Sequence, residues 1–318
     1  MNGHVFSTEA FATIQEAIDK AAPGSTVWVH PGVYTENLTL HKNLTLNGII
    51  DESGARPRIN PPSGTGLLVT EGVDYEVSGF LFSDSEVGIR GTAYGMYVSN
   101  SSVVIHSNIF SNIHRVGNGF QAYDTTLGGE AIYVGGLVDV YNNIFFNNSG
   151  GVGTVALRSD RGTHRFYNNT VTGNPTHSPF QFGQRGSATI WMAGPRMFVF
   201  NNIIANDAKA TGLHLWDPYG RWMQLAQIEH NLLFNNAGGN TTGVPVSHII
   251  EADPTFIDTG TNDFRLDLGS IAIDAGKNGG APDGDIDGQR RPLDGNGDGV
   301  RHTDIGAYES AAFRTGRR

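Results

Sequence analysis

The sequence predicts an all-β solenoid, in which short strands wind into successive turns that stack on one another. The first observation is a phrase that recurs along the chain: SNIFSN at Ser107, NNIFFNN at Asn142, NNTVTGN at Asn168, NNIIAND at Asn201 and HNLLFNN at His230. One Asn from each copy gives spacings of 35, 26, 33 and 29 residues; these are Asn108, Asn143, Asn169, Asn202 and Asn231. Such a period is typical of chains in which each repeat forms one turn.

The make-up of each copy supports the same fold class. A short run of Ile, Phe and Val is joined to Asn, Ser or Gly, which is the pattern of a strand followed by a turn. A strand this short cannot bury its apolar side alone, so we expect it to pair in parallel with the strand one turn above. Asn suits the corner because it tolerates left-handed backbone angles and its amide can hydrogen-bond along the stack. The composition agrees, because 43 glycines and 16% charged residues are typical of a chain with many tight turns.

A capping helix is expected over residues 11–22, FATIQEAIDKAA. Its apolar residues share one face, and Pro23-Gly24 ends it; they are Phe11, Ile14, Ala17, Ile18 and Ala21. A helix here would cover the first turn, whose open edge would otherwise invite aggregation. The alternating segments STVWVHPGVYTENLTL and NLTLNGI then predict the first strands.

Composition also limits the domain organisation and the partners. Because solenoids grow by adding turns, we expect one domain over residues 1–318, with an acidic, Gly/Asp-rich closing segment at 278–310. The net charge of −10 argues against nucleic acid as a partner. No apolar stretch approaches the roughly 20 residues of a membrane span, and the absence of cysteine excludes a disulfide framework or a thiol nucleophile.

Two segments resemble a known group of proteins. Residues 14–37, IQEAIDKAAPGSTVWVHPGVYTEN, resemble the cap and first turn of right-handed parallel β-helix proteins with the pectin-lyase-like fold. Residues 285–310, DIDGQRRPLDGNGDGVRHTDIGAYES, resemble a closing segment of many bacterial secreted members. The resemblance implies a right-handed parallel β-helix and a location outside the cell or on the surface of a bacterium. It does not select an activity, because the group includes polysaccharide lyases, glycoside hydrolases, epimerases and non-catalytic surface proteins.

The length of the solenoid suits a linear polymer. The strand landmarks predict about eight turns, which at roughly 4.8 Å per strand gives a rod of about 40 Å. We therefore expect a polysaccharide or oligosaccharide as the partner.

A second strand precedes each Asn phrase: GMYVS, AIYVGG, TVALRSD, TIWMAG and GLHLWD. Period-two alternation separates its core-facing residues from an outward set, which comprises Tyr97, Tyr133, Ala156, Arg158, Trp191 and His214. Aromatic rings can stack on sugars, so Tyr97 and Trp191 are candidate substrate-binding residues. The alternative is that these aromatic residues only cover their neighbours on the sheet.

The loops that enter these strands predict a notch. Loops 112–130 and 173–187 are long, whereas loop 147–153 between them is short. Loops on a rigid scaffold often carry function. The candidate substrate-binding residues around the notch are Asp124, Glu130, Arg185 and Trp216.

We expect β-elimination of an acidic polysaccharide at this notch. In that reaction a base removes the proton beside a carboxylate, and a cation stabilises the anion that forms. The resemblance implies an Arg or Lys base beside calcium, which makes Arg158 the candidate, with His214 and Tyr133 as acid or base helpers. Because a guanidinium stays protonated near neutral pH, Arg158 can instead hold the substrate carboxylate. An outward ion pair between Arg158 and Asp160 is a purely structural alternative.

Two other functions stay open. Glycoside hydrolysis canonically needs two carboxyl groups about 5 to 9.5 Å apart, which Asp160 could form with Asp124, Glu130 or Asp217. A non-catalytic carbohydrate-binding or surface protein would bind sugar on the same residues without acid–base groups. His114, His164 and His177 are expected in loops without a zinc-binding spacing, so we do not expect these histidines to form a metal site.

The acidic tail resembles a calcium loop in part. In DGNGDGVRHTD, alternate positions carry oxygen ligands and Gly299 can make the turn; the candidate ligands are Asp294, Asn296, Asp298 and Asp304. The closing acid falls at loop position 11 rather than 12, which departs from the EF-hand pattern. A structural calcium ion and a solvated turn that ends the solenoid are therefore both open interpretations.

Overall fold

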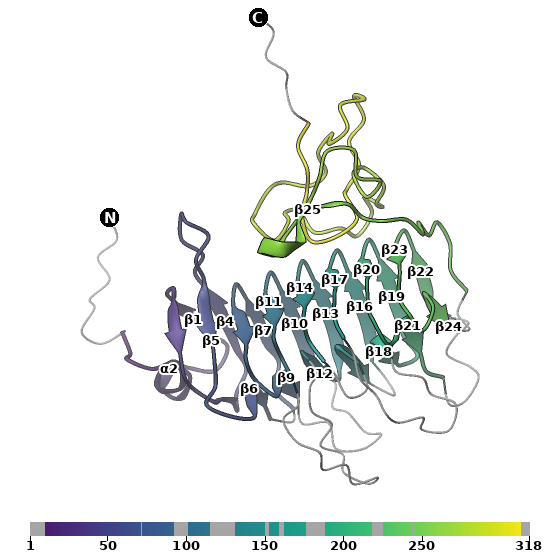
Figure 1. Ribbon diagram of the computed structural model, residues 1–318. Helices are drawn as coiled ribbons and strands as arrows, with labels where there is room; N and C mark the ends of the chain where they lie inside the picture. Colours follow the sequence, from purple (N-terminus) through teal and green to yellow (C-terminus); the bar gives the residue numbers. More distant parts are fainter. Residues whose placement is uncertain are drawn as a thin grey trace, which may run out of the picture.

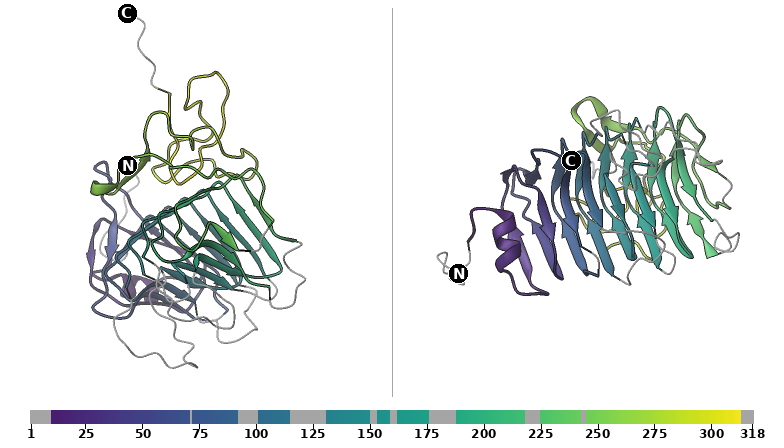
Figure 2. Two further views of the ribbon diagram at one scale, coloured as in Figure 1. Left: turned by 45° about the vertical axis from the view of Figure 1, so that its right-hand side comes forward. Right: turned by 90° about the horizontal axis from the view of Figure 1, so that it is seen from below.

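The protein is a right-handed parallel β-helix built from three eight-stranded sheets (Figure 1). The computed structural model describes residues 10–70, 72–91, 101–114, 131–149, 153–158, 162–175, 188–217, 225–242 and 245–312. Every sheet pairs each strand in parallel with the strand of the next turn, so the eight strands per sheet confirm the expected number of turns. Figure 2 shows the strands stacked side by side along the axis of the solenoid.

Each turn contributes one strand to each sheet. The first sheet contains β1 (Thr26–Val29), β4 (Leu44–Gly48), β7 (Tyr75–Ser78), β10 (Ser102–His106), β13 (Leu137–Tyr141), β16 (Thr163–Tyr167), β19 (Arg196–Phe200) and β22 (Gln227–Glu229). The second contains β2 (Gly32–Tyr34), β5 (Pro57–Ile59), β8 (Leu81–Ser83), β11 (Ile109–Ser111), β14 (Ile144–Phe146), β17 (Thr170–Thr172), β20 (Ile203–Ala205) and β23 (Leu232–Phe234). The third contains β3 (Leu38–Leu40), β6 (Thr65–Val69), β9 (Val87–Gly91), β12 (Ile132–Val134), β15 (Val155–Arg158), β18 (Ala188–Ala193), β21 (Thr211–Leu215) and β24 (Thr241–Thr242).

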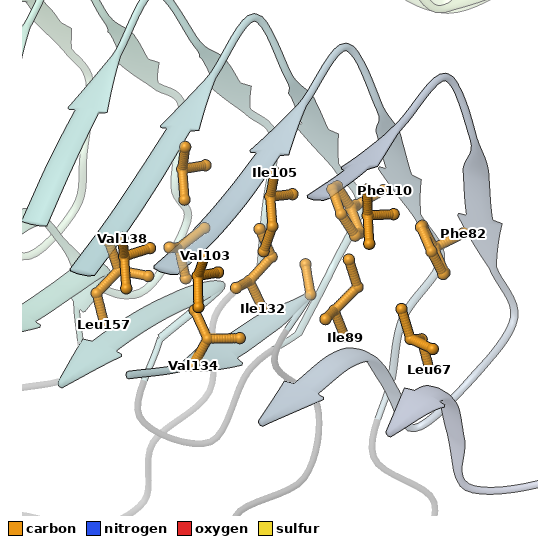
Figure 3. Packing of buried hydrophobic residues seen from close by; sticks show 14 of the residues in the cluster. Leu67, Phe82, Ile89, Val103, Ile105, Phe110, Ile132, Val134, Val138 and Leu157 are labelled. Carbon is orange, nitrogen blue, oxygen red and sulfur yellow. The ribbon is translucent and has the colours of Figure 1, made fainter. Parts of the chain in front are cut away.

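The core lies between the three sheets and is built from inward side chains of all three; Figure 3 shows part of it. Phe82, Phe110 and Phe145 occupy equivalent positions in the second sheet, and their rings stack at centroid distances of 5.2 and 4.9 Å. Ile105 from the first sheet and Ile132 from the third are fully buried around this stack. Identical register from turn to turn therefore lets like side chains pack on like.

The Asn phrases form a corner between the first and second sheets, and the expected hydrogen-bonded ladder is present. Asn143 illustrates it: its side chain accepts the backbone N–H of Asn108 at 3.0 Å and donates to the Asn169 side chain at 3.1 Å. The residue before each ladder Asn adopts the left-handed conformation, for example Asn142 at φ 52° and Asn168 at φ 50°. We expected one Asn both to take the left-handed backbone angles and to form the hydrogen-bonded ladder. In the structure the first residue of each pair takes those angles and the second forms the ladder.

The N-terminal cap is a shorter helix than expected, α2 (Ile14–Lys20). The Thr13 side chain caps its first turn, and Ile14 and Ile18 are buried against the solenoid. Phe11 precedes the cap residue and is 39% exposed, so its assignment to the buried face was wrong.

Residues 253–312, which we call the C-terminal segment, pack back along the outer face of the second sheet (Figure 1). The expectation that the acidic tail lies near the last turn was therefore wrong. The segment contains a two-stranded antiparallel ribbon, β25 (Phe256–Asp258) and β26 (Asp263–Leu266), joined by the 3-10 turn η2 (Thr259–Thr261). The physical reason is that the second sheet has apolar residues on both faces, so its outer face also needs a cover.

Contacts along several turns hold this segment in place. The rings of Phe264 and Phe146 lie 5.0 Å apart, and Leu266 packs in a cluster with Ile203. The left-handed corner residues add hydrogen bonds, since Asn142 Nδ2 donates to the Gly284 carbonyl at 2.7 Å. A long ligand therefore cannot lie along the second sheet. Among the residues described, no helix is long and apolar enough to cross a membrane.

Candidate functional site

The outer face of the third sheet carries a row of side chains that changes from turn to turn. Strand register aligns Arg90, Tyr133, Ala156, Trp191 and His214. The sequence reasoning missed Arg90. It placed Tyr97 at the start of this row, but β9 is the strand that pairs with β12, and Tyr97 lies outside the described residues. The alternation in VGIRG was the signal that could have found Arg90.

The predicted outward orientation is confirmed for Tyr133, Ala156 and Trp191. Inward neighbours such as Ile132, Leu157 and Ile190 belong to the main core. Trp191 and Ala156 instead form a separate cluster on the outside of the sheet, together with Ala193, Tyr133 and Trp216. The short alanine side chains leave room for the two tryptophan rings.

The two tryptophans pack on each other rather than standing in solvent. Their ring centroids lie 5.7 Å apart with an interplanar angle of 28°, and Trp191 is only 7% exposed. Trp191 therefore fits the alternative in which outward aromatic residues cover their neighbours. Trp216 is half-buried, and its ring lies beside the guanidinium of Arg158.

Arg158, the last residue of β15, is half-buried beside these rings. Its Cζ atom lies 5.8 Å from the centroid of the Trp216 ring, a cation–π arrangement that positions the guanidinium. Its Nε atom is buried and has no hydrogen-bond partner in the part of the chain that the structure describes. Arg158 thus places a positive charge beside Trp216 on the outer face of the sheet.

His214 and Tyr133 lie on the same face at different distances from Arg158. Tyr133 is on the adjacent strand β12, and His214 is two strands away on β21. With a strand spacing of about 4.8 Å, their backbones lie roughly 5 and 10 Å from β15. Both side chains are half-buried, and the Nε2 atom of His214 is itself buried.

The rest of the predicted notch lies outside the described residues. This applies to most of the two long loops and to four candidate site residues, Asp124, Glu130, Asp160 and Arg185. Their roles stay predictions, and so does the ion pair between Arg158 and Asp160.

The histidines expected in loops are placed differently. His164 lies on β16 and is completely buried in the core, so its assignment to a loop was wrong. Its Nε2 atom lies 3.2 Å from the Ala193 carbonyl, and burial lowers its pKa to about 4. His114 is half-buried, with Nδ1 2.8 Å from the Ser149 hydroxyl, and its pKa is lowered by burial. His177 lies outside the described residues.

The four candidate calcium ligands fall into two environments. Asp294, Asn296 and Asp298 lie in a turn, where their side chains accept backbone hydrogen bonds from Gly297, Asp298 and Val300. Asp304 is fully buried, and its carboxylate accepts hydrogen bonds from the backbone of Asp274 and Ser310. Asp304 thus already serves as an internal acceptor, while calcium binding stays a prediction.

Comparison with known proteins found matches among solved structures only. The right-handed parallel β-helix that the sequence resemblance implied is present as three stacked parallel sheets. No protein-family model matches it, and no curated protein matches it. Among solved structures it is similar to pectate lyase Pel9A, with 13% identity, 93% of this chain and 90% of that chain covered, and a TM-score of 0.38. It is also similar to the deglycosylated pectin methylesterase from Aspergillus niger, with 16% identity, 83% and 89% covered, and a TM-score of 0.35.

Proposed function

We propose that the protein binds a linear acidic polysaccharide along the outer face of the third sheet and cleaves it by β-elimination beside Arg158. The observation that carries this proposal is the set of outward residues on the five strands β9, β12, β15, β18 and β21. Two arginines, a histidine and a tyrosine occur there, and the described outward positions of these strands carry no carboxylate.

Because the whole chain is acidic, binding of an anionic polymer depends on local positive charge such as that of these arginines. A protein with a net charge of −10 repels an anionic polymer unless a local cationic site overcomes the repulsion. Arg90 and Arg158 supply two positive charges on one face. The planar fork of a guanidinium also matches the two oxygens of a carboxylate.

Arg158 is assigned to the substrate carboxylate. In the elimination, the proton leaves the carbon beside that carboxylate, a carbon–carbon double bond forms, and the bond to the leaving sugar oxygen breaks. A guanidinium held against Trp216 would stabilise the negative charge that develops. The candidate proton acceptors are Tyr133, which is nearer, and His214, because histidine is the side chain that most often acts as a general base.

The absence of outward carboxylates on these described strands weighs against hydrolysis, which canonically uses a carboxyl pair. A non-catalytic sugar-binding protein would keep the arginines but would not turn over substrate. Hydrolysis would therefore cleave the polymer without forming a double bond, whereas a binding protein would leave the polymer intact.

The test is to incubate the chain with polygalacturonate, alginate and a neutral polysaccharide. β-Elimination predicts reducing ends that appear together with the ultraviolet absorbance of an unsaturated uronate. Reducing ends without that absorbance would indicate a hydrolase, and binding without either would indicate a binding protein. Arg158→Ala should abolish the absorbance, whereas Arg165→Ala removes an equal charge, paired with Asp139 on the first sheet, and should retain it. Retained turnover in Arg158→Ala would contradict the assignment.

A further inference from the structure

The corner between the first and second sheets has one residue with left-handed backbone angles in each turn, and near the end of the solenoid this residue changes from Asn to His. Asn142, Asn168 and Asn201 occupy it in successive turns with φ between 50° and 56°, and His230 and His248 follow at φ 53° and 51°. The asparagines donate side-chain hydrogen bonds to carbonyls of the C-terminal segment. Imidazoles replace these amides in the last two turns, next to Glu229.

These three side chains converge. One ligand atom from each of Glu229, His230 and His248 lies within 4.8 Å of the others, the one such group of His, Cys, Asp and Glu found among the described residues. The two imidazole rings stack at 4.6 Å with an interplanar angle of 9°. Nδ1 of His230 is buried, lies 3.7 Å from Glu229 Oε2, and makes no hydrogen bond to any residue that the structure describes.

The charge states suit a metal ion. Burial, and secondly the neighbouring His248, lower the pKa of His230. The hydrogen bond from Lys277 lowers the pKa of Glu229, which keeps the carboxylate ionised. Lys277 Nζ binds Oε1 of this carboxylate at 2.6 Å, while Oε2 faces the histidines. Neutral imidazole and carboxylate are ligands of zinc and related divalent ions.

We propose that Glu229, His230 and His248 form a binding site for one divalent transition-metal ion of the zinc class. A tetrahedral ion with bonds of about 2.1 Å holds its ligand atoms roughly 3.4 Å apart, so from separations of up to 4.8 Å the side chains must close by at most about 1.4 Å. His248 is exposed, and rotation of its side chain can supply that movement. A water molecule would complete the coordination, as at other sites with three protein ligands.

The ion would join the last full turn of the solenoid to the chain that follows it. Glu229 ends β22, whereas His248 belongs to residues 245–250, which pair with that turn through the bridges Glu229–Ser247 and Leu232–Ile250. Lys277 connects the same carboxylate to the C-terminal segment. A metal here would stabilise the exposed end of a stack of strands.

Calorimetric titration of the untagged, metal-free chain with zinc tests this proposal. We expect one zinc per chain, with binding weakened more than about tenfold in His230→Asn and in His248→Asn. Asn is the appropriate replacement because the preceding turns carry Asn in the same left-handed conformation. His41→Asn removes a histidine beside Asp19 elsewhere on the surface and should bind zinc as the unchanged chain does.

A second readout separates binding at the site from non-specific binding. Zinc should raise the melting temperature of the chain, because a ligand that binds only the folded state stabilises it. Glu229→Gln, which nearly preserves the size of the side chain, should remove that shift. An absence of zinc binding, or equal zinc binding by the three site variants and the His41→Asn control, would overturn the proposal.

Discussion

His164 shows how strongly one buried side chain can couple stability to pH. The residue is fully buried on β16, and burial lowers its pKa to about 4 from an ordinary value of 6.5. The folded chain therefore resists a proton that the unfolded chain accepts. The stability contribution is present above pH 6.5 and is lost as the pH falls towards 4.

We therefore predict that His164→Gln becomes less pH-sensitive than the unchanged chain. Gln does not titrate and can keep a hydrogen bond to the Ala193 carbonyl. A pKa shift of this size corresponds to about 3 kcal/mol of unfolding free energy between pH 6.5 and 4. Urea unfolding across this range measures it. Identical slopes in the variant and the unchanged chain would contradict the assignment.

Asp304 couples stability to pH in the opposite direction. Burial raises its pKa to about 6, so the folded chain favours the protonated carboxyl. This contribution is complete below the unfolded value near 4 and is lost as the pH rises through 6. As the pH rises from 4 to 7, the titration of Asp304 should lower the unfolding free energy of the unchanged chain by about 3 kcal/mol. We predict that Asp304→Asn lacks this decrease, as measured by the same urea unfolding. An equal or greater loss in the variant would contradict this prediction.

At the scale of structural elements, the Asn corner holds the turns in register. Asn169 is fully buried, accepts the backbone N–H of Asn143 at 3.0 Å and donates to the carbonyls of Val140 and Tyr167. Asn169→Ala leaves these buried groups without partners, so we predict a loss of about 3–5 kcal/mol in unfolding free energy. Asn147→Gly is the matched control, because Asn147 is exposed at φ 52° and Gly accepts that angle. Equal losses in the two variants would contradict a special role for the buried ladder.

The turn at Asp294 to Asp298 provides a second test at this scale. Its side chains accept hydrogen bonds from the N–H groups of their own turn, and Asp294 bonds Gly299 as well. If calcium binds this turn, adding it should raise the melting temperature and a chelator should reverse the shift. Asp298→Ala should abolish the effect, while Asp267→Ala, in an exposed turn of the same segment, should not. No shift with calcium would identify Asp294, Asn296 and Asp298 as turn residues only.

The sequence was most informative where the structure repeats. The spacing from Asn108 to Asn231 predicted parallel stacking, and the strand landmarks predicted the number of turns, because each turn meets the same physical requirement. The outward direction of Trp191 and Arg158 followed from strand alternation alone. The burial of Trp191 did not, because it depends on Trp216, which comes from another turn.

Features that join distant parts of the chain could not be predicted. Glu229, His230 and His248 converge through stacking of turns, without a spacing that periodicity would reveal. The position of the C-terminal segment likewise depends on the outer face of the second sheet. An apolar outward residue such as Ile203 resembles an ordinary core residue in the sequence, because both faces of that sheet are buried.

At the scale of the whole molecule, the C-terminal segment covers an apolar strip on the outer face of the second sheet. Ile144, Phe146, Ile203 and Leu232 point out of the second sheet and pack against this segment. We predict that a chain ending at residue 252 exposes this apolar strip, binds a hydrophobic dye and self-associates. Light scattering and analytical ultracentrifugation measure the association.

Two point variants separate the docking of this segment from its mere presence. Phe264 is 5% exposed and packs on Phe146, so Phe264→Ala should cost about 3–5 kcal/mol and increase dye binding. Leu268 lies in the same segment but is 66% exposed, so Leu268→Ala should change neither. If Phe264→Ala and the shortened chain both stay monomeric and bind no dye, the outer face of the second sheet does not depend on its cover. If only these two chains associate, the segment is part of the fold rather than an appendage.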